Sequence, residues 1–153
     1  MTRSIGLVVG DSRLQIAAAS VESCLIELDR NGQYRVAPGS LDVAFVSSEE
    51  SGQLHKDFFD DPDPTDVMTF PGDPADNHAG DIAICPSIAA ASAKREGLPF
   101  DEELTLYLVH AWLHLAGLRD SDEDERREMR AAEARMLDQL RNAGALLKAA
   151  WEA

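Results

Sequence analysis

Residues 108–120 read Leu-Val-His-Ala-Trp-Leu-His-Leu-Ala-Gly-Leu-Arg-Asp, and both the fold and the function that we expect depend on this segment. His110 and His114 are four residues apart, so on an α-helix their rings project from the same face. Gly117 marks the end of that helix, where a residue with positive φ lets the chain turn back. Because the turn brings Asp120 towards the two imidazoles, the stretch predicts a metal site at the end of an apolar helix.

The ligand types favour zinc. Two imidazole nitrogens and one carboxylate oxygen suit this metal, and a site with three protein ligands keeps a fourth position open for water. The alternative is that His110 and His114 are ordinary helix residues without a metal. The helix around them is apolar on nearly every side, however, and imidazoles on a buried helix need partners for their polar atoms. We therefore expect one zinc ion per chain, held by His110, His114 and Asp120.

The residue after the first histidine bears on the reaction. In the His-Glu-x-x-His peptidases this position carries the glutamate that acts as general base. Here it is Ala111, so the usual means of activating water for peptide cleavage is missing. Glu103 lies on the same helical face as His110 and could support the metal site, but we expect it to be a solvated residue of the first helical turn.

Composition restricts the classes of partner. The 153 residues fit one domain, residues 1–153. They include 28 acidic and 14 basic residues, which gives a formal net charge of -14. This acidity argues against a general nucleic-acid coat, and no DNA partner is expected, because phosphate binding needs local Lys or Arg. The overall acidity does not exclude a small basic patch beside the metal.

The location is also an expectation from the sequence. Cys24 and Cys85 lie far apart in apolar segments, so we expect buried free thiols rather than a disulfide. The short apolar run near the N-terminus does not resemble a signal peptide, and no run approaches the length of a membrane span. We expect a cytoplasmic protein without a membrane partner.

Hydrophobic periodicity and turn residues predict an α/β (α+β) fold. It has a single small mixed sheet of about four strands, mostly parallel with one antiparallel edge, packed with about five helices, one of them a zincin-like metal helix. The first three strands are joined through helices and should be parallel, whereas the fourth follows a loop and should be antiparallel. The expected strands are 5–9, 41–46, 67–70 and 80–85, and the expected helices are 12–28, 48–59, 86–96, 101–117 and 123–148.

Four blocks of sequence resemble a known family. Residues 64–71, Pro-Thr-Asp-Val-Met-Thr-Phe-Pro, are similar to Pro-Thr-Asp-Val-Leu-Ser-Phe-Pro, and residues 80–82 match a Gly-Asp-Ile strand. Residues 110–120 are similar to His-Gly-x-Leu-His-Leu-x-Gly-Tyr-Asp-His, and the acidic loop with the helix of Met129 follows. In order and spacing these blocks resemble the YbeY-type endoribonucleases of ribosomal-RNA maturation, most clearly between residues 41 and 136.

The resemblance implies a compact α/β domain with one zinc ion that cleaves single-stranded RNA in ribosome maturation. It implies ligand roles for His110 and His114, and ribosomal RNA or the small ribosomal subunit as partner. Asp120 stands where the family usually has a third histidine. A carboxylate ligand reduces the positive charge of the site, so the metal should be a weaker Lewis acid.

A second departure from the family concerns the phosphate. Phe59 aligns with an arginine that is important for catalysis in the family, and a phenyl ring cannot clamp a phosphate. Arg119 is the first candidate to replace that cation and Lys56 the second. Two alternatives therefore stay open: a non-catalytic, ribosome-associated zinc protein, and a zinc hydrolase of peptides or amides.

Three further polar residues have structural interpretations. Asp66 and Asp81 could orient a ligand or a water, but we favour a role at the starts of strands, where carboxylates satisfy loop amides. His78 is a spare possible ligand, and we expect it to be a solvated loop residue.

Overall fold

The computed structural model describes residues 3–61, 63 and 65–152. Met1, Thr2, Pro62, Pro64 and Ala153 lie outside the described residues, and so does the start of the block at 64–71. No helix in the described part of the chain is long and apolar enough to cross a membrane. The elements in chain order are β1 (Arg3–Val9), β2 (Leu14–Ile16), α1 (Ala18–Asp29), β3 (Gly39–Phe45), α2 (Ser48–Phe59), β4 (Val67–Pro71), the 3-10 helix η1 (Pro74–Asp76), β5 (His78–Ile84), α3 (Pro86–Glu96), α4 (Phe100–Leu115), α5 (Glu123–Ala143) and β6 (Ala149–Trp151).

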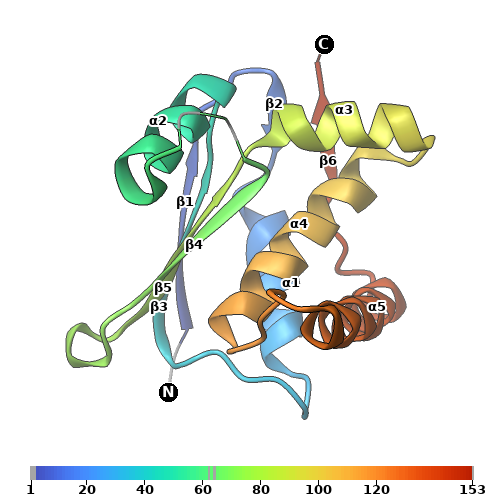
Figure 1. The fold of residues 1–153 in the computed structure, drawn as a ribbon. Coiled ribbons are helices and arrows are strands. Elements are labelled where there is room, and N and C mark those ends of the chain that lie inside the picture. The colour runs from blue at the N-terminus through green and yellow to red at the C-terminus, as the bar shows by residue number, and fades with distance from the viewer. Residues whose placement is uncertain (1–2, 62, 64, 153) are drawn as a thin grey trace.

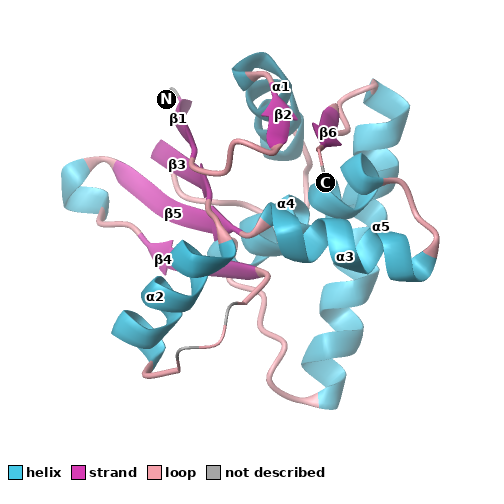
Figure 2. Ribbon diagram, turned by 90° about the horizontal axis from the view of Figure 1, so that it is seen from above, coloured by secondary structure: helices cyan, strands magenta, loops and turns pink. Residues whose placement is uncertain are grey.

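The main sheet has the strand order β1-β3-β5-β4. The pairs β1–β3 and β3–β5 are parallel, and β4 pairs with β5 in the antiparallel sense at one edge. Helices α1, α4 and α5 gather on one side of this sheet, whereas α2 lies near one end of the strands, away from them (Figure 1 and, seen from above, Figure 2). The expected fold class, with five α-helices and a mixed sheet that is mostly parallel with one antiparallel edge, is confirmed.

The strand with reversed direction is not the one that we expected. We predicted that the strand at 67–70 would run parallel to its predecessor, because a helix joins the two. Phe45 at the end of β3 and Val67 at the start of β4 both lie opposite Ile84 of β5. Helix α2 therefore returns the chain to the end of the sheet where β3 stopped, and β4 runs back from there.

A second, two-stranded sheet corrects the expectation of a single sheet. The predicted helix at 12–28 begins only at Ala18, because Leu14–Ile16 forms β2 and pairs antiparallel with β6, Ala149–Trp151. The predicted helix at 123–148 ends at Ala143, where Gly144 adopts a left-handed conformation with φ 66°. The guanidinium of Arg13 lies 4.6 Å from the centre of the Trp151 ring, a cation–π contact that fastens this small sheet.

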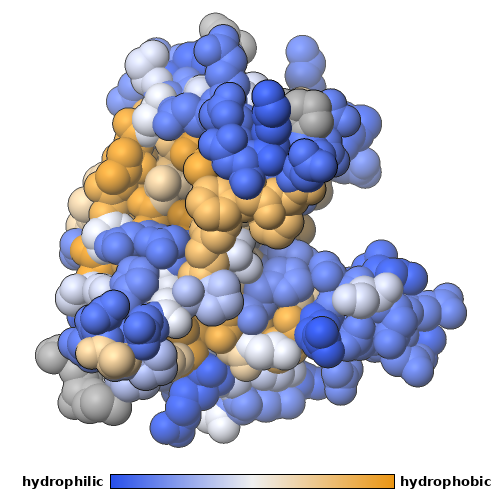
Figure 3. Space-filling view, turned by 60° about the vertical axis from the view of Figure 1, so that its left-hand side comes forward, coloured by the Kyte–Doolittle hydropathy of each residue, from blue (hydrophilic) through white to orange (hydrophobic). Residues whose placement is uncertain are grey.

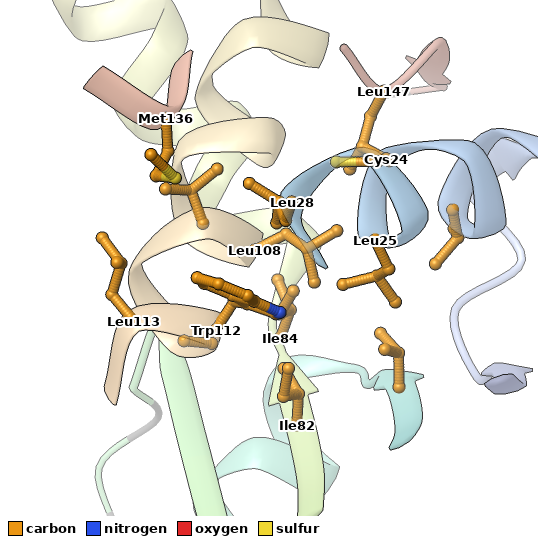
Figure 4. Packing of buried hydrophobic residues seen from close by; sticks show 14 of the residues in the cluster. Cys24, Leu25, Leu28, Ile82, Ile84, Leu108, Trp112, Leu113, Met136 and Leu147 are labelled. Carbon is orange, nitrogen blue, oxygen red and sulfur yellow. The ribbon is translucent and has the colours of Figure 1, made fainter. Parts of the chain in front are cut away.

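Helix α4 passes through the middle of the core. Trp112 is fully buried and lies among Leu108, Leu113 and Ile84 (Figure 4). Cys24 is also part of this core, and burial raises the pKa of its thiol to about 12. Both cysteines are buried and free, as expected. Because α4 is held by packing on most of its circumference, the side chains on its one open face have a fixed position.

Candidate metal centre

The two histidines and the aspartate meet as the sequence predicts. His110 and His114 are about one quarter exposed, and their Nε2 atoms lie 3.0 Å apart. Oδ2 of Asp120 lies 3.5 Å from each of these nitrogens. The turn behind α4 depends on Gly117, whose φ is +102°. Since a Cβ there would meet nothing within 4 Å, the glycine is needed for its backbone angle rather than for space.

Both imidazoles are oriented through their second ring nitrogen. Nδ1 of His110 donates a hydrogen bond to Oε2 of Glu133 at 2.5 Å, and Nδ1 of His114 donates to the carbonyl oxygen of Leu118 at 3.0 Å. A neutral imidazole whose Nδ1 carries the proton presents a lone pair at Nε2. Two lone pairs and a carboxylate oxygen therefore converge, an arrangement that is repulsive unless a cation or a proton lies between them.

The separations of these three atoms fit one metal ion. With edges of 3.0, 3.5 and 3.5 Å, a point roughly 2.0–2.1 Å from all three atoms exists just off their plane, which is the range of zinc–nitrogen and zinc–oxygen bonds. The donor set of two nitrogens and one oxygen is borderline between hard and soft, which suits zinc among other divalent metals. His110, His114 and Asp120 thus form a candidate metal centre.

The electrostatics of the site favour positive charge. Burial lowers the pKa of His110, but the hydrogen bond with Glu133 and the charges of Glu133, Asp120 and Asp66 raise it, and the net shift is upward. A surrounding that stabilises a proton on this imidazole also stabilises a divalent cation beside it. The negative groups are therefore placed as a metal requires.

The candidate centre opens into a groove of about 380 Å³. Its lining includes the metal centre, residues of α2 and the chain at 65–69. Besides the three candidate ligands, the groove is lined by His55, Phe59, Thr65, Asp66, Val67, Met68 and Thr69.

The strand beside the groove has a free edge. Cys85 N–H donates to Asp66 O, and Gly72 N–H donates to Ala79 O. Because hydrogen-bonded pairs alternate in an antiparallel ladder, Val67 and Thr69 direct their backbone groups away from β5. The N–H of Val67 is taken by the Asp66 carboxylate, whereas that of Thr69 has no partner among the described residues. Helix α4 packs beside this strand.

The two candidate phosphate clamps lie outside the groove lining. Arg119 is exposed in the turn between Gly117 and Asp120, and within the described residues it makes no hydrogen bond or ion pair. Lys56 is exposed on α2. The described residues that line the groove include no lysine or arginine, so a bound metal ion would be the main positive charge in it.

Asp66 lines the groove and also caps the strand start. Its Oδ1 accepts hydrogen bonds from the Val67 N–H and the Thr65 hydroxyl, which is the structural role expected of it. The negative charge of Asp66 also contributes to the raised pKa of His110.

His78 is not the solvated loop residue that we expected. It begins β5, accepts a hydrogen bond from the Ser40 hydroxyl at Nδ1 (2.6 Å) and donates from Nε2 to Asp81 (3.0 Å). The hydrogen bond with Asp81 is the main cause of its raised pKa. Asp42, His78 and Asp81 lie close enough to share an ion, but both ring nitrogens of His78 already have partners.

Two glutamates have roles that sequence reasoning missed. Glu133 accepts a hydrogen bond from the candidate ligand His110. The feature of the sequence that could have indicated this role is a lone carboxylate on the apolar face of α5, which also carries Met129 and Met136. Glu103, which we expected to be solvated, is only 7% exposed and accepts a hydrogen bond from the Ser92 hydroxyl at 2.6 Å. It joins α4 to α3 and lies too far along the helix to orient a ligand.

The protein combines a mixed sheet with a buried helix, and the edge strand and this helix flank a His/His/Asp centre. This is the framework of a hydrolase with a candidate metal site. The chain matches the profile of the family described as endoribonuclease YbeY over residues 11–141. It therefore belongs to the endoribonuclease YbeY family, which confirms the resemblance seen in the sequence and the expectation of a hydrolase of the nuclease class.

Individual relatives agree with this membership. The endoribonuclease YbeY of Micrococcus luteus is 36% identical over 107 residues, which cover 64% of this chain and 68% of that protein. The protein of the same name from Rhodococcus opacus is 37% identical over 110 residues, with 64% and 61% covered. That of Protochlamydia amoebophila is 33% identical over 132 residues, with 84% and 87% covered.

A solved structure has the same fold. The solution structure of TM1509 from Thermotoga maritima superposes with a TM-score of 0.62 at 25% sequence identity, and the alignment covers 91% of this chain and 90% of that one. The likeness extends over both the sheet and the helices, since so much of each chain is matched.

Proposed function

We propose that this chain is a zinc-dependent, single-strand-specific endoribonuclease that processes ribosomal RNA during ribosome maturation in the cytoplasm. One observation carries the proposal: in a chain of the endoribonuclease YbeY family, two Nε2 lone pairs and a carboxylate oxygen converge within 3.0–3.5 Å of one another in an open groove. Its partner is ribosomal RNA or the small ribosomal subunit.

Each residue of the centre has a distinct task in this proposal. His110, His114 and Asp120 hold the ion, and a bound zinc ion supplies Lewis acidity towards a phosphoryl oxygen. Glu133 and the Leu118 carbonyl keep Nδ1 of each histidine protonated, so that each Nε2 is available as a ligand. The N–H of Thr69, which has no partner among the described residues, is a neutral donor that can meet a phosphate or a base.

The size of the groove supports binding of a single RNA strand. Its charge supports a modest rate of RNA cleavage. A volume of about 380 Å³ is that of a site for a ligand of roughly nucleotide size. The chain has a formal charge of -14, and the described residues of the groove lining include no lysine or arginine. A phosphate therefore gains little from the protein's own charge, and Arg119 or Lys56 must reach in from outside the lining if either one acts as a clamp.

Cleavage of a labelled fragment of small-subunit ribosomal RNA tests the proposal. The zinc-loaded protein should cut the single strand, should lose that activity after chelation, and should regain it when zinc is returned. A duplex of the same sequence should stay intact, and His114→Ala should be inactive. Cleavage that survives chelation, or that persists in His114→Ala, would show that a contaminating nuclease or another site is responsible.

The free edge of β4 favours a second candidate, a zinc hydrolase of peptides. An extended peptide can add to an exposed strand edge through backbone hydrogen bonds, and the edge at Thr69 lies in the metal groove. Against it stands Ala111, which is fully buried and offers no general base. The described part of the groove lining offers no lysine or arginine. This favours a third candidate, a non-catalytic zinc protein of the ribosome, which would bind zinc and RNA without cutting.

A further inference from the structure

Helix α2 ends in two exposed aromatic residues. Phe58 is 62% exposed and Phe59 is 54% exposed, which is unusual for side chains of this size. Their rings are not isolated. The centre of the Phe58 ring lies 4.9 Å from that of Phe70, and the Phe59 ring lies 6.4 Å from Phe70 and 5.4 Å from His55. These separations are those of packed aromatic pairs, so the rings have defined positions.

This aromatic cluster (His55, Phe58, Phe59 and Phe70) connects two hollows. Phe59 and His55 line the metal groove. Phe70 of β4 lines a second hollow, of about 520 Å³, on the outer face of the sheet, together with Leu54 of α2. Figure 3 shows a hydrophobic patch on this side of the molecule, with hydrophilic residues above and below it. The cluster therefore leads from the candidate metal centre, around the free edge of β4, to the outer face.

The chemistry of the cluster selects a flat, uncharged ligand surface. Exposed phenyl rings offer stacking faces, and stacking on aromatic side chains is a common way to hold nucleobases of a single strand. The same region has little to offer a phosphate, because no lysine or arginine lines either the groove or the outer hollow among the described residues. Affinity for a nucleic acid at this surface must therefore come from the bases.

We propose that the aromatic cluster is a binding site for unpaired nucleobases of the RNA whose phosphate enters the metal groove. Phe59 stacks on the base nearest the metal centre, and Phe58 with Phe70 receives the next base along the outer face. The identity of the occupant rests on the proposed function. Only a single strand fits, since bases inside a duplex are stacked on one another and present no free face.

Binding of a short single-stranded RNA by the zinc-loaded full chain tests the site. The probe is a fluorescent 2′-O-methyl hexanucleotide, checked for integrity after each titration. Phe59→Ala should weaken its binding by roughly five- to a hundredfold, which is the range for loss of one base–aromatic stack. Phe59→Trp should retain the affinity. The matched control is Leu98→Ala, which removes a side chain that is 51% exposed but lines neither hollow.

Two further measurements distinguish base stacking on Phe59 from an effect of the substitution on the shape of the site or from binding through charge. An abasic nucleotide at the position that stacks on Phe59 should weaken binding to the wild type but should have no effect on Phe59→Ala, because the contact is already absent. The salt dependence should be shallow, since few phosphates are neutralised. A steep salt dependence with equal affinity of the wild type and Phe59→Ala would overturn the site.

The outcomes for the site and for the proposed function differ. If the hexanucleotide binds with the expected dependence on Phe59 but ribosomal RNA is never cut, the stacking site stands and the nuclease proposal fails. If RNA is cut in a zinc-dependent manner and Phe59→Ala has unchanged affinity, the stacking site is wrong and the nuclease proposal stands. Absence of any binding by the wild type would also overturn the stacking site.

Discussion

Glu133 on α5 accepts a hydrogen bond from Nδ1 of His110 on α4, with 2.5 Å between the two atoms. The glutamate side chain is only 14% exposed, and it lies on the helix face that otherwise packs Met129 and Met136 into the core. A carboxylate in that setting needs a partner. The contact therefore fixes the ring of a candidate ligand and compensates for the burial of the charge.

Replacement of Glu133 should weaken the metal site without loss of the fold. Glu133→Gln keeps a hydrogen-bond acceptor but removes the charge, so zinc affinity should fall by roughly 10- to 100-fold, as for other residues that orient a ligand histidine. Competition with a chromophoric chelator measures this affinity. Glu128→Gln is the control, because Glu128 is exposed on the same helix. Equal affinity of both variants and the wild type would remove Glu133 from the site.

The local features of this fold were predictable from the sequence. Helices α2 and α3 have the bounds that we expected: Ser47 caps α2 with a capping box to Glu50, and Gly97 ends α3 in a left-handed conformation. The apolar stretch around Trp112 correctly indicated a buried helix. These features depend on residues that are close in sequence, so their signals are complete within a short window.

The features that escaped prediction depend on distant partners. Leu14 has helical spacing with the residues of α1, but it is buried by pairing of β2 with β6, more than a hundred residues away. The direction of β4 depends on the end of the sheet to which α2 returns the chain. Hydrophobic periodicity does not encode this. The role of Glu133 depends on the packing of α5 against α4, which brings it to His110. A lone carboxylate on an apolar face does not indicate by itself which residue it contacts.

Asp120→His should preserve or tighten zinc binding. Oδ2 of Asp120 lies 3.5 Å from both Nε2 atoms, and the side chain is partly exposed, so an imidazole has space to take its place. A third imidazole is a good zinc ligand. Zinc titration of Asp120→His beside Asp120→Ala checks this, and the alanine variant should bind much more weakly. Affinities of Asp120→Ala equal to those of the wild type would exclude residue 120 as a ligand.

The protein should not be a general peptidase. Ala111 takes the place of the glutamate base and is fully buried, so it faces the core rather than the groove. Casein should stay intact in the presence of zinc. Ala111→Glu should not create activity and should lower the melting temperature by roughly 10 °C or more, because it buries an unpaired carboxylate. Casein hydrolysis that requires zinc and is abolished by His110→Ala would refute this.

Arg119 is the first candidate for the cation that meets a phosphate. If it acts as a clamp, Arg119→Ala should lower RNA cleavage by roughly a hundredfold, the scale of one contact to transition-state charge. Zinc content should not change, since Arg119 lies beside the candidate ligand rather than within the ligand set. Lys56→Ala is the parallel test of the second candidate. An Arg119→Ala variant as active as the wild type would leave the metal ion to meet the phosphate without this residue.

One zinc ion should be held by His110, His114 and Asp120. A crystal structure of the zinc-loaded protein, with diffraction data collected on both sides of the zinc absorption edge, measures this directly. We expect one strong anomalous peak, roughly 2.0–2.2 Å from each of the three ligand atoms. A peak between Asp42, His78 and Asp81, or no peak at the α4 site in crystals that contain zinc, would contradict it.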